Sequence, residues 1–467
     1  MNIIPNITNY LNTQLNSFFT TFVSSPKSLQ SLEYKLPNLI QSLSLQSLAM
    51  VLESIDDAFA SSTERKCNYI IKDRKERTIN TVSGPLSFTR RYYLHRTTNT
   101  YYFYLDDFLE LLPYKRCTPY VEASILENLA KDTATTYRQA AAPFGMSKGF
   151  VYNLLKRLDI TTDTPDLNQK VKCKQLYVQA DEEHIHLQFK KGGRMKSNGK
   201  KKSTNYELKE VTIFTGKEKI GKHRYRLLNK VIITPFFNES NDDFNKRVDD
   251  YIQRNFEYEN KLYCYGDGAS WIKSLAEDIA SYYILDKFHF AQSLTRATGG
   301  SKFPEVVGLL NRYAKGGEKE EFEYLINMHM GLEARTKNYN IKARDYLLNN
   351  WNAYQLNYTL DNQSGCSAEG INSHYFSSYY SSRPKGFCIQ NIHTIGVIRA
   401  LYYSGFNIVN YYQENRRRIN TEVNEYYNSK KYQKKTKKLT LLDINQSIPA
   451  TLGRPSGTRE ALKKIIH

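Results

Sequence analysis

The order of the elements predicted between Cys173 and Asp286 constrains this chain more than any other feature. Three β-prone runs come first: KQLYVQADEEHIHLQFK, NYELKEVTIFTG and HRYRLLNKVIIT, with Gly216 and Gly221 at the turn between the last two. A helix preceded by Ser240, the strand KLYCYGDG, the helix SWIKSLAEDIA and the strand YYILD then follow. The sequence therefore predicts three meandering antiparallel strands followed by helix, strand, helix and strand.

This order of elements is typical of the ribonuclease-H-like fold, an α/β core built on a mixed five-stranded sheet. We expect residues 170–295 to form the first part of this core and residues 363–420 the last part. Residues 296–362 have mostly helical patterns and predict a helical insertion between the two parts. Residues 421–467, which include KKYQKKTKK, are expected to form a basic C-terminal tail.

The N-terminal part of the chain predicts a different, mainly helical architecture. Residues 1–75 are expected to be helical, because apolar residues recur at a helical period between Leu45 and Ile55. Residues 76–165 are expected to form a DNA-binding region. There, a Ser83-Gly84 turn between β-prone runs predicts a small β-hairpin, and residues 135–158 resemble a helix-turn-helix.

The predicted helix-turn-helix would carry a basic surface on its second helix. The first helix would end near Gly145, and Ser147 would cap the second. A buried apolar stripe on the second helix consists of Val151, Leu154, Leu155 and Leu158. The opposite face carries the residues that would contact phosphates and base edges: Lys148, Tyr152, Asn153, Lys156 and Arg157. An ordinary helical hairpin with a solvated basic face explains the same pattern.

The charge balance favours a polyanionic partner. The chain has 66 Lys and Arg against 47 Asp and Glu, a formal net charge of +19, and nucleic acid is the commonest partner of so basic a chain. A generally basic, soluble surface is the alternative. No apolar stretch approaches the ~18–20 residues of a membrane span. Since the six cysteines form no CxxC motif and no secretory signal is evident, we expect a cytoplasmic, nucleoid-associated protein without a membrane partner.

Three carboxylates occupy positions where this fold would bring them together. Asp181 lies on the first strand, on the same face as Glu183 by period-two alternation. Asp267 ends the fourth strand between two glycines, which would let the backbone approach a ligand closely. Glu369 lies in the first turn of a helix that Ser367 would cap. An exposed acidic strand face, a turn and a helix start, respectively, explain each residue by itself.

Taken together, the three carboxylates predict a metal site. Three such groups can hold two Mg²⁺ ions ~3.5–4 Å apart, one activating a nucleophilic water or 3′-hydroxyl and the other stabilising the leaving oxygen. Hard oxygen ligands suit Mg²⁺, with Mn²⁺ as a substitute, and do not suit Zn²⁺.

Three sequence blocks carry a resemblance to a known family. YVQADEEHIHLQ, YGDGASWIKSLAEDIASYYILDKFHF and CSAEGINSHYFSSYYSSRPKGF resemble the active-site blocks of the ISLre-type bacterial insertion-sequence transposases, which are similar to the Mutator-like transposases with a DDE site. The resemblance extends over about residues 65 to 415. It implies that Asp181, Asp267 and Glu369 are the catalytic and metal-binding residues. It also implies that Asp286 and His289 support the site, although a structural histidine explains His289 equally well.

Further residues are candidates for DNA contact. Trp271 would stack on a flipped base, although core packing is the usual fate of such a side chain. Arg383 would contact a phosphate or lie in a surface turn. Residues 190–202, which include Lys200 and Lys201, hold seven Lys or Arg and no acid and would track the DNA backbone or form a solvated loop.

These features predict a DDE transposase. It would bind the terminal inverted repeats of an insertion sequence and target DNA as a homodimer or higher oligomer, and it would catalyse metal-dependent strand cleavage and strand transfer. The alternative is a sequence-specific DNA-binding protein, or a nuclease with a ribonuclease-H-like domain that does not join strands. The presence of all three carboxylates favours the first prediction.

Overall fold

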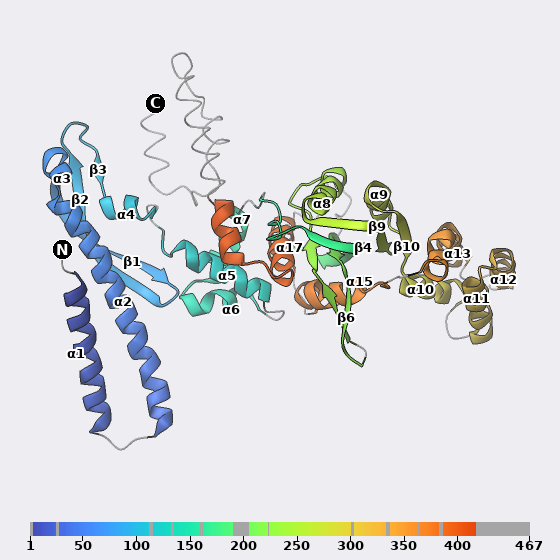
Figure 1. Ribbon diagram of the computed structural model, residues 1–467, viewed down its shortest axis with the longest axis horizontal. Helices are drawn as coiled ribbons and strands as arrows, with labels where there is room; N and C mark the ends of the chain where they lie inside the picture. The colour runs from blue at the N-terminus through green and yellow to red at the C-terminus, as the bar shows by residue number, and fades with distance from the viewer. Residues whose placement is uncertain are drawn as a thin grey trace, which may run out of the picture. The chain divides into compact units, whose positions relative to one another are not determined.

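The computed structural model describes most of the chain as two compact units (Figure 1). The described residues are 3–24, 28–111, 115–131, 135–158, 160, 162–189, 205–222, 224–299, 303–332, 337–361, 364–382 and 386–416. The first unit takes in Met1–Asn128 and Thr135–Leu154, and the second takes in Leu129–Ala134 and Leu155–His467. Among the described residues, no helix combines the length and apolar character needed to cross a membrane.

The first unit begins with a helical hairpin and a small sheet. Helices α1 (Ile3–Val23) and α2 (Leu29–Ser61) are followed by the short α3 (Thr63–Asn68). The antiparallel sheet has the order β1-β2-β3 and consists of β1 (Tyr69–Thr81), β2 (Gly84–His95) and β3 (Tyr101–Tyr102). Helix α4 (Tyr104–Phe108) completes a core to which α2 contributes Ala49 and Leu52, β2 contributes Phe88 and α4 contributes Leu105.

The predicted β-hairpin is confirmed, but its first strand begins earlier than expected. Thr81 pairs with Gly84, and Gly84 has a positive φ of 118° that favours glycine at this turn. The strand β1 begins at Tyr69, so the helical region ends before residue 75. Most of the first half of β1 is exposed and charged, and such a stretch lacks the apolar alternation by which strands are recognised.

Short helices follow this sheet. They are α5 (Pro119–Lys131), α6 (Tyr137–Ala141), a 3₁₀ turn at Ala142–Phe144 and α7 (Lys148–Arg157). The turn between α6 and α7 contains Gly145 in the left-handed conformation, and Ser147 Oγ accepts a hydrogen bond of 3.2 Å from the Phe150 N–H. In α7, Val151, Leu154 and Leu155 are buried, whereas Leu158 just beyond it is partly buried. Helices α6 and α7 and the turn between them therefore lie where the sequence predicts them.

The second unit is built on a mixed five-stranded sheet with the order β10-β9-β4-β5-β8. Its strands are β4 (Val171–His186), β5 (Asn205–Phe214), β8 (Val231–Ile233), β9 (Phe256–Gly266) and β10 (Tyr282–Leu285). Strand β5 runs antiparallel to β4 and β8, while β9 is parallel to β4 and β10 is parallel to β9. Helix α8 (Asn241–Asn255) precedes β9 and α9 (Ser270–Ile279) connects β9 to β10, as the sequence predicts.

The third β-prone run divides in a way that the sequence did not predict. Strands β6 (Gly216–Gly221) and β7 (Arg224–Leu228) form a separate two-stranded sheet, and only β8 joins the main sheet. Gly216 therefore begins a strand instead of lying at the turn. The division follows burial, because β8 is fully buried whereas β6 and β7 are mostly exposed and carry alternating charges.

Helices complete the second unit. Helix α10 (Lys287–Ala297) shares a hydrophobic core with the predicted insertion, which contains α11 (Pro304–Gly316), α12 (Lys319–Leu332), α13 (Lys337–Asn349) and α14 (Trp351–Thr359). The chain then returns to the sheet through α15 (Ala368–Ile371), a π-helical stretch at Asn372–Ser377, α16 (Ser378–Tyr380) and α17 (Ile389–Tyr403). The predicted tail, residues 421–467, lies outside the described residues.

Candidate active site

Asp181 lies at the centre of the candidate site. Alternation along β4 places it on the same face as Gln179 and Glu183, and all three residues are buried, with Asp181 6% exposed. Asn372 Nδ2 donates a hydrogen bond of 3.3 Å to Asp181 Oδ2. Burial, with a contribution from the charges of Glu369 and Asp267, raises the pKa of Asp181 to about 6. The structure therefore brings the three predicted carboxylates close enough for their charges to interact.

Asp267 is held at the point where β9 ends. Its Oδ1 accepts a hydrogen bond of 2.9 Å from the Ala269 N–H, and its carbonyl accepts one from the Tyr346 hydroxyl. Both flanking glycines are needed for local packing. A Cβ at Gly266 would lie 2.5 Å from Ile272 Cγ2, and Gly268 has a positive φ of 96°. The close approach expected at these glycines is therefore made by the protein's own side chains.

Glu369 reaches the site from the first turn of α15. Its Oε1 lies 3.2 Å from His289 Nε2, and its side chain is about half exposed. Ser367 makes no capping hydrogen bond, contrary to expectation. Its N–H instead donates to Gln179 Oε1 at 3.1 Å, and Gln179 lies on the same buried face of β4 as Asp181. This contact connects the start of α15 to the strand that carries Asp181.

Lys217 also positions this segment, and sequence reasoning missed it. Its Nζ donates hydrogen bonds to the Gly365 carbonyl at 2.7 Å and to Ser367 Oγ at 2.6 Å. Lys217 belongs to β6, so the extra hairpin supports the loop that precedes Glu369. Burial lowers the pKa of Lys217. The contact joins residues far apart in the sequence, and no local pattern indicates it.

Asp286 and His289 lie at the start of α10. The Asp286 side chain caps this helix by accepting a hydrogen bond of 3.2 Å from the Phe288 N–H, and its own N–H donates to the Gly266 carbonyl at 2.9 Å. His289 contacts Glu369, as described above. Asp286 thus fixes the start of the helix that presents His289 to the candidate site.

Glu210 is a fourth carboxylate that sequence reasoning missed. It pairs with Asp181 across β4 and β5, and the directly opposed residues of such a pair project from the same face. Its Oε2 is buried without a hydrogen-bond partner among the described residues. Burial raises the pKa of Glu210 well above its ordinary value, and the charges of Asp181 and Glu183 act in the same direction. Its place on the apolar side of the run YELKEVTIF was the available signal.

Trp271 does not have the predicted role. The side chain is buried in the core beside Phe244, and its Nε1 donates a hydrogen bond of 3.0 Å to Glu182 Oε2. A buried and hydrogen-bonded indole has no free face for a base. The expectation that Trp271 stacks on DNA is therefore wrong, and core packing explains the residue.

The remaining predicted DNA contacts fall into two groups. Lys148, Asn153 and Lys156 are exposed on α7, and Arg157 is partly exposed. The whole basic segment 190–202 lies outside the described residues, whereas the strands before and after it, β4 and β5, are described. Lys200, Lys201 and Arg383 lie outside the described residues as well.

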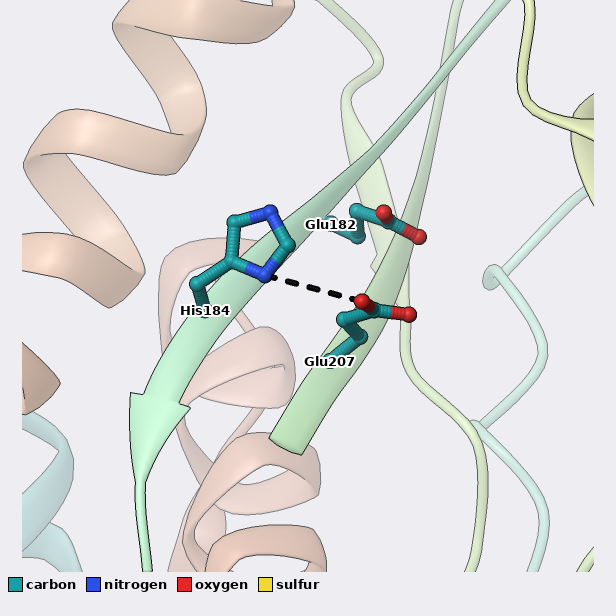
Figure 2. A group of neighbouring side chains, drawn as sticks. All are labelled: Glu182, His184 and Glu207. Atoms are coloured by element: carbon teal, nitrogen blue, oxygen red, sulfur yellow. Dashed lines mark ion pairs between the residues drawn. The ribbon is translucent and has the colours of Figure 1, made fainter. Parts of the chain in front are cut away.

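A second cluster occupies the opposite face of β4. Glu182, His184 and Glu207 offer ligand atoms that all lie within 4.8 Å of one another (Figure 2), and among the described residues this is the group of three that satisfies such spacing. His184 Nδ1 lies 3.8 Å from Glu207 Oε1, and their side chains are 61% and 59% exposed. The Glu182 carboxylate already accepts the Trp271 hydrogen bond, and the charge of Lys209 interacts with Glu182 and Glu207. This cluster is therefore distinct from the predicted site.

Comparison with known proteins identifies the family. The chain matches an uncharacterised protein family, UPF0236, over residues 25–439. It belongs to UPF0236. One UPF0236 protein of Caldanaerobacter subterraneus subsp. tengcongensis, whose name joins eleven locus designations, is 26% identical over 408 residues, which cover 86% of this chain and 84% of the relative. UPF0236 protein TTE2489 of the same organism is 26% identical over 409 residues, which cover 85% and 84% respectively.

The UPF0236 match takes in both the predicted site and the N-terminal elements that precede it. It begins before α2 and extends beyond α17. All three carboxylates, the supporting residues Asp286 and His289, and Glu210 lie within it. The family match therefore spans most of the chain rather than a single region.

Proposed function

We propose that this chain is a DDE-type transposase that cleaves and joins DNA strands with bound divalent metal. The observation that carries the proposal is the convergence of Asp181, Asp267 and Glu369, which come from a central strand, the end of the neighbouring strand and a distant helix. The three residues are widely separated in the sequence, and the buried Asp181 interacts electrostatically with both of the others. A buried Asp181 beside two further carboxylates is costly without a cation.

The sheet topology supports a ribonuclease-H-like assignment of the second unit. Three consecutive antiparallel strands, β4, β5 and β8, are joined by two parallel strands on the other side of β4. This order is the one expected from the sequence for that fold. A fold alone does not specify an activity, so the proposal depends on the carboxylates.

The donor set fits the proposed metal. Carboxylate oxygens are the ligands that Mg²⁺ and Mn²⁺ prefer. Two such ions, when bound, would activate the attacking hydroxyl and stabilise the leaving oxygen of a phosphoryl transfer. Asp181, Asp267 and Glu369 would supply the carboxylate ligands. Asn372 orients Asp181, and His289 orients Glu369.

The DNA-binding part of the proposal concerns α7 and the net charge. The exposed Lys148, Asn153 and Lys156 would contact phosphates and base edges of the element ends, and the charge of +19 would attract DNA over a distance. The relatives' names add support, since three of them join eleven, four and two locus designations in one organism. Several loci sharing one protein name are what copies of a mobile element would produce.

The decisive experiment measures two reactions on one substrate. The full chain is incubated with a labelled duplex taken from the DNA that flanks its own gene, with Mg²⁺ or with EDTA, and a supercoiled target plasmid. We expect Mg²⁺-dependent nicking at the element end and covalent joining of that end to the plasmid. Nicking without joining would identify a nuclease, and binding without nicking would identify a DNA-binding protein.

A matched binding measurement tests the proposed role of α7 in DNA binding. Lys156→Ala should weaken binding to all sequences and reduce the slope of log K against log salt by about 1. Lys219→Ala, an exposed lysine on β6, is the control. If Lys156→Ala binds with unchanged affinity and salt dependence, α7 has no part in DNA binding.

A further inference from the structure

The hairpin of α1 and the outer part of α2 carries an apolar stripe that is only partly buried. On α1, Ile7, Leu11, Leu15 and Phe18 recur at spacings of three and four residues, and on α2 the matching residues are Leu32, Leu36, Leu39 and Leu43. No described side chain of α1 is buried, and on the outer part of α2, residues 29–43, burial is reached only at Leu43. Each helix therefore leaves its apolar seam only partly buried.

Further large apolar side chains flank this seam. Val23 is 81% exposed and Phe19 is 49% exposed, and Ile4, Leu29, Tyr34 and Ile40 on the same two helices are exposed as well. In Figure 1, α1 and the beginning of α2 extend away from the small sheet of the first unit, whose core begins further along α2. So many exposed large apolar side chains on one hairpin are typical of an interaction site.

A helical hairpin with so little burial is only weakly stable by itself. Helices in water are stabilised mainly by packing of an apolar face, and ordering their side chains costs entropy. Two helices bury one side of each seam, whereas four helices packed around one core bury both sides. Two helices are therefore too few to bury the apolar pattern of this hairpin, and further helices would be needed.

The charge distribution indicates what completes the bundle. Helix α1 contains no charged residue, and residues 29–43 contain one Glu and one Lys, although the chain as a whole carries +19. DNA needs cations on the surface that binds it, and an interfacial membrane helix needs them on its polar face. Two copies of a strongly basic chain repel each other except where the surface is uncharged. A second copy of this chain fits the hairpin best.

We propose that α1 and residues 29–43 of α2 pack against the same segments of a second copy to form an intermolecular four-helix bundle. The same patch on both copies then forms a two-fold symmetric interface. This inference uses no residue of the candidate active site and does not depend on the proposed catalytic activity.

The test measures the mass of the full chain in solution. Nuclease-treated protein is examined by sedimentation equilibrium in high salt. The salt releases bound nucleic acid and screens the repulsion between two basic chains. We expect a dimer. A monomer throughout the micromolar range would overturn the proposal, and a monomer that floats with phosphatidylcholine vesicles would identify a lipid surface as the occupant instead.

Matched variants locate the interface. Phe19→Glu combined with Val23→Glu should raise the dimer dissociation constant about a hundredfold or more, because carboxylates would be buried without partners. Ile220→Glu combined with Tyr324→Glu adds the same charge at exposed apolar positions outside the hairpin and should leave the dimer intact. Unfolding of the hairpin in the first variant would appear as a loss of the helical circular dichroism signal. The milder substitution Phe19→Ser is therefore tested as well. It should weaken the dimer less than the double variant. A dimer unaffected by all hairpin variants would place the interface elsewhere and overturn the proposal.

Discussion

The two faces of strand β4 carry similar groups of side chains in different environments. One face presents Asp181, which is buried and interacts with carboxylates from β5, β9 and α15. The other presents Glu182 and His184, which lie beside Glu207 near solvent (Figure 2). Spacing alone favours the second face as a metal site, but water screens exposed charges and makes their proximity inexpensive. Asp181 and the opposed Glu210 are buried, and burying acids is costly, so their place beside Asp267 and Glu369 is the stronger indication of function.

The largest expected effect is on catalysis by Asp181, Asp267 and Glu369. Asp181→Asn, Asp267→Asn and Glu369→Gln should each reduce Mg²⁺-dependent cleavage and joining by about a thousandfold or more, because each removes a ligand from a shared metal site. A double variant should be little worse than a single one, since the three groups act together. Single-turnover rates on the end duplex measure both effects.

The same variants should still bind DNA and fold. Replacing a carboxylate by an amide removes negative charge and cannot weaken attraction to phosphate. Any one of the three residues whose variant cleaves at a near-native rate is not part of the catalytic group.

The next effect concerns stability and pH. In the folded chain without metal, Asp181 has a pKa of about 6 against an ordinary value of 3.8. The folded state therefore binds the extra proton between these pH values, and the free energy of unfolding should fall by up to about 3 kcal/mol as the pH rises from about 4 to about 6. Asp181→Asn should remove this component of the fall, whereas Glu207→Gln should retain it.

Denaturant titrations at several pH values measure the pH dependence of the free energy of unfolding, and repeating them with Mg²⁺ makes the test more specific. A bound cation stabilises the charged carboxylate, so added Mg²⁺ should raise the stability of the unmodified chain most above pH 6. If Asp181→Asn and the unmodified chain show the same pH dependence, Asp181 is not the group that titrates.

The sequence predicts the elements of the candidate site better than it predicts their contacts. Alternation in β4, the glycines around Asp267 and the helical period of α9 are local signals, and these elements lie where expected. The role of Trp271 was predicted wrongly because its partner Glu182 is distant in sequence. Lys217 was missed for the same reason, since its contacts with Gly365 and Ser367 form only after folding.

A smaller effect is expected at Lys217. Lys217→Met removes both hydrogen bonds that hold the loop before Glu369, so this carboxylate should be positioned less precisely. We expect a 10–100-fold loss of cleavage at low Mg²⁺, roughly the cost of losing an outer contact of a metal ligand, with partial recovery at high Mg²⁺. Lys219→Met, on an exposed position of the same strand, is the control. Equal rates in the two variants would mean that the hairpin does not support the site.

The smallest effect is expected at His184 and Glu207, the exposed pair near the end of β4 and the start of β5. Glu207→Gln and His184→Gln should change the free energy of unfolding by no more than about 0.5 kcal/mol, because exposed pairs contribute little. Cleavage rates should stay within about twofold, since neither side chain faces Asp181. Glu182 is not a suitable probe because its loss would leave the buried Trp271 N–H unpaired. A thermal shift by Mg²⁺, Mn²⁺ or Zn²⁺ that Glu207→Gln abolishes and Asp181→Asn retains would make the cluster of Glu182, His184 and Glu207 the metal site and reverse the comparison.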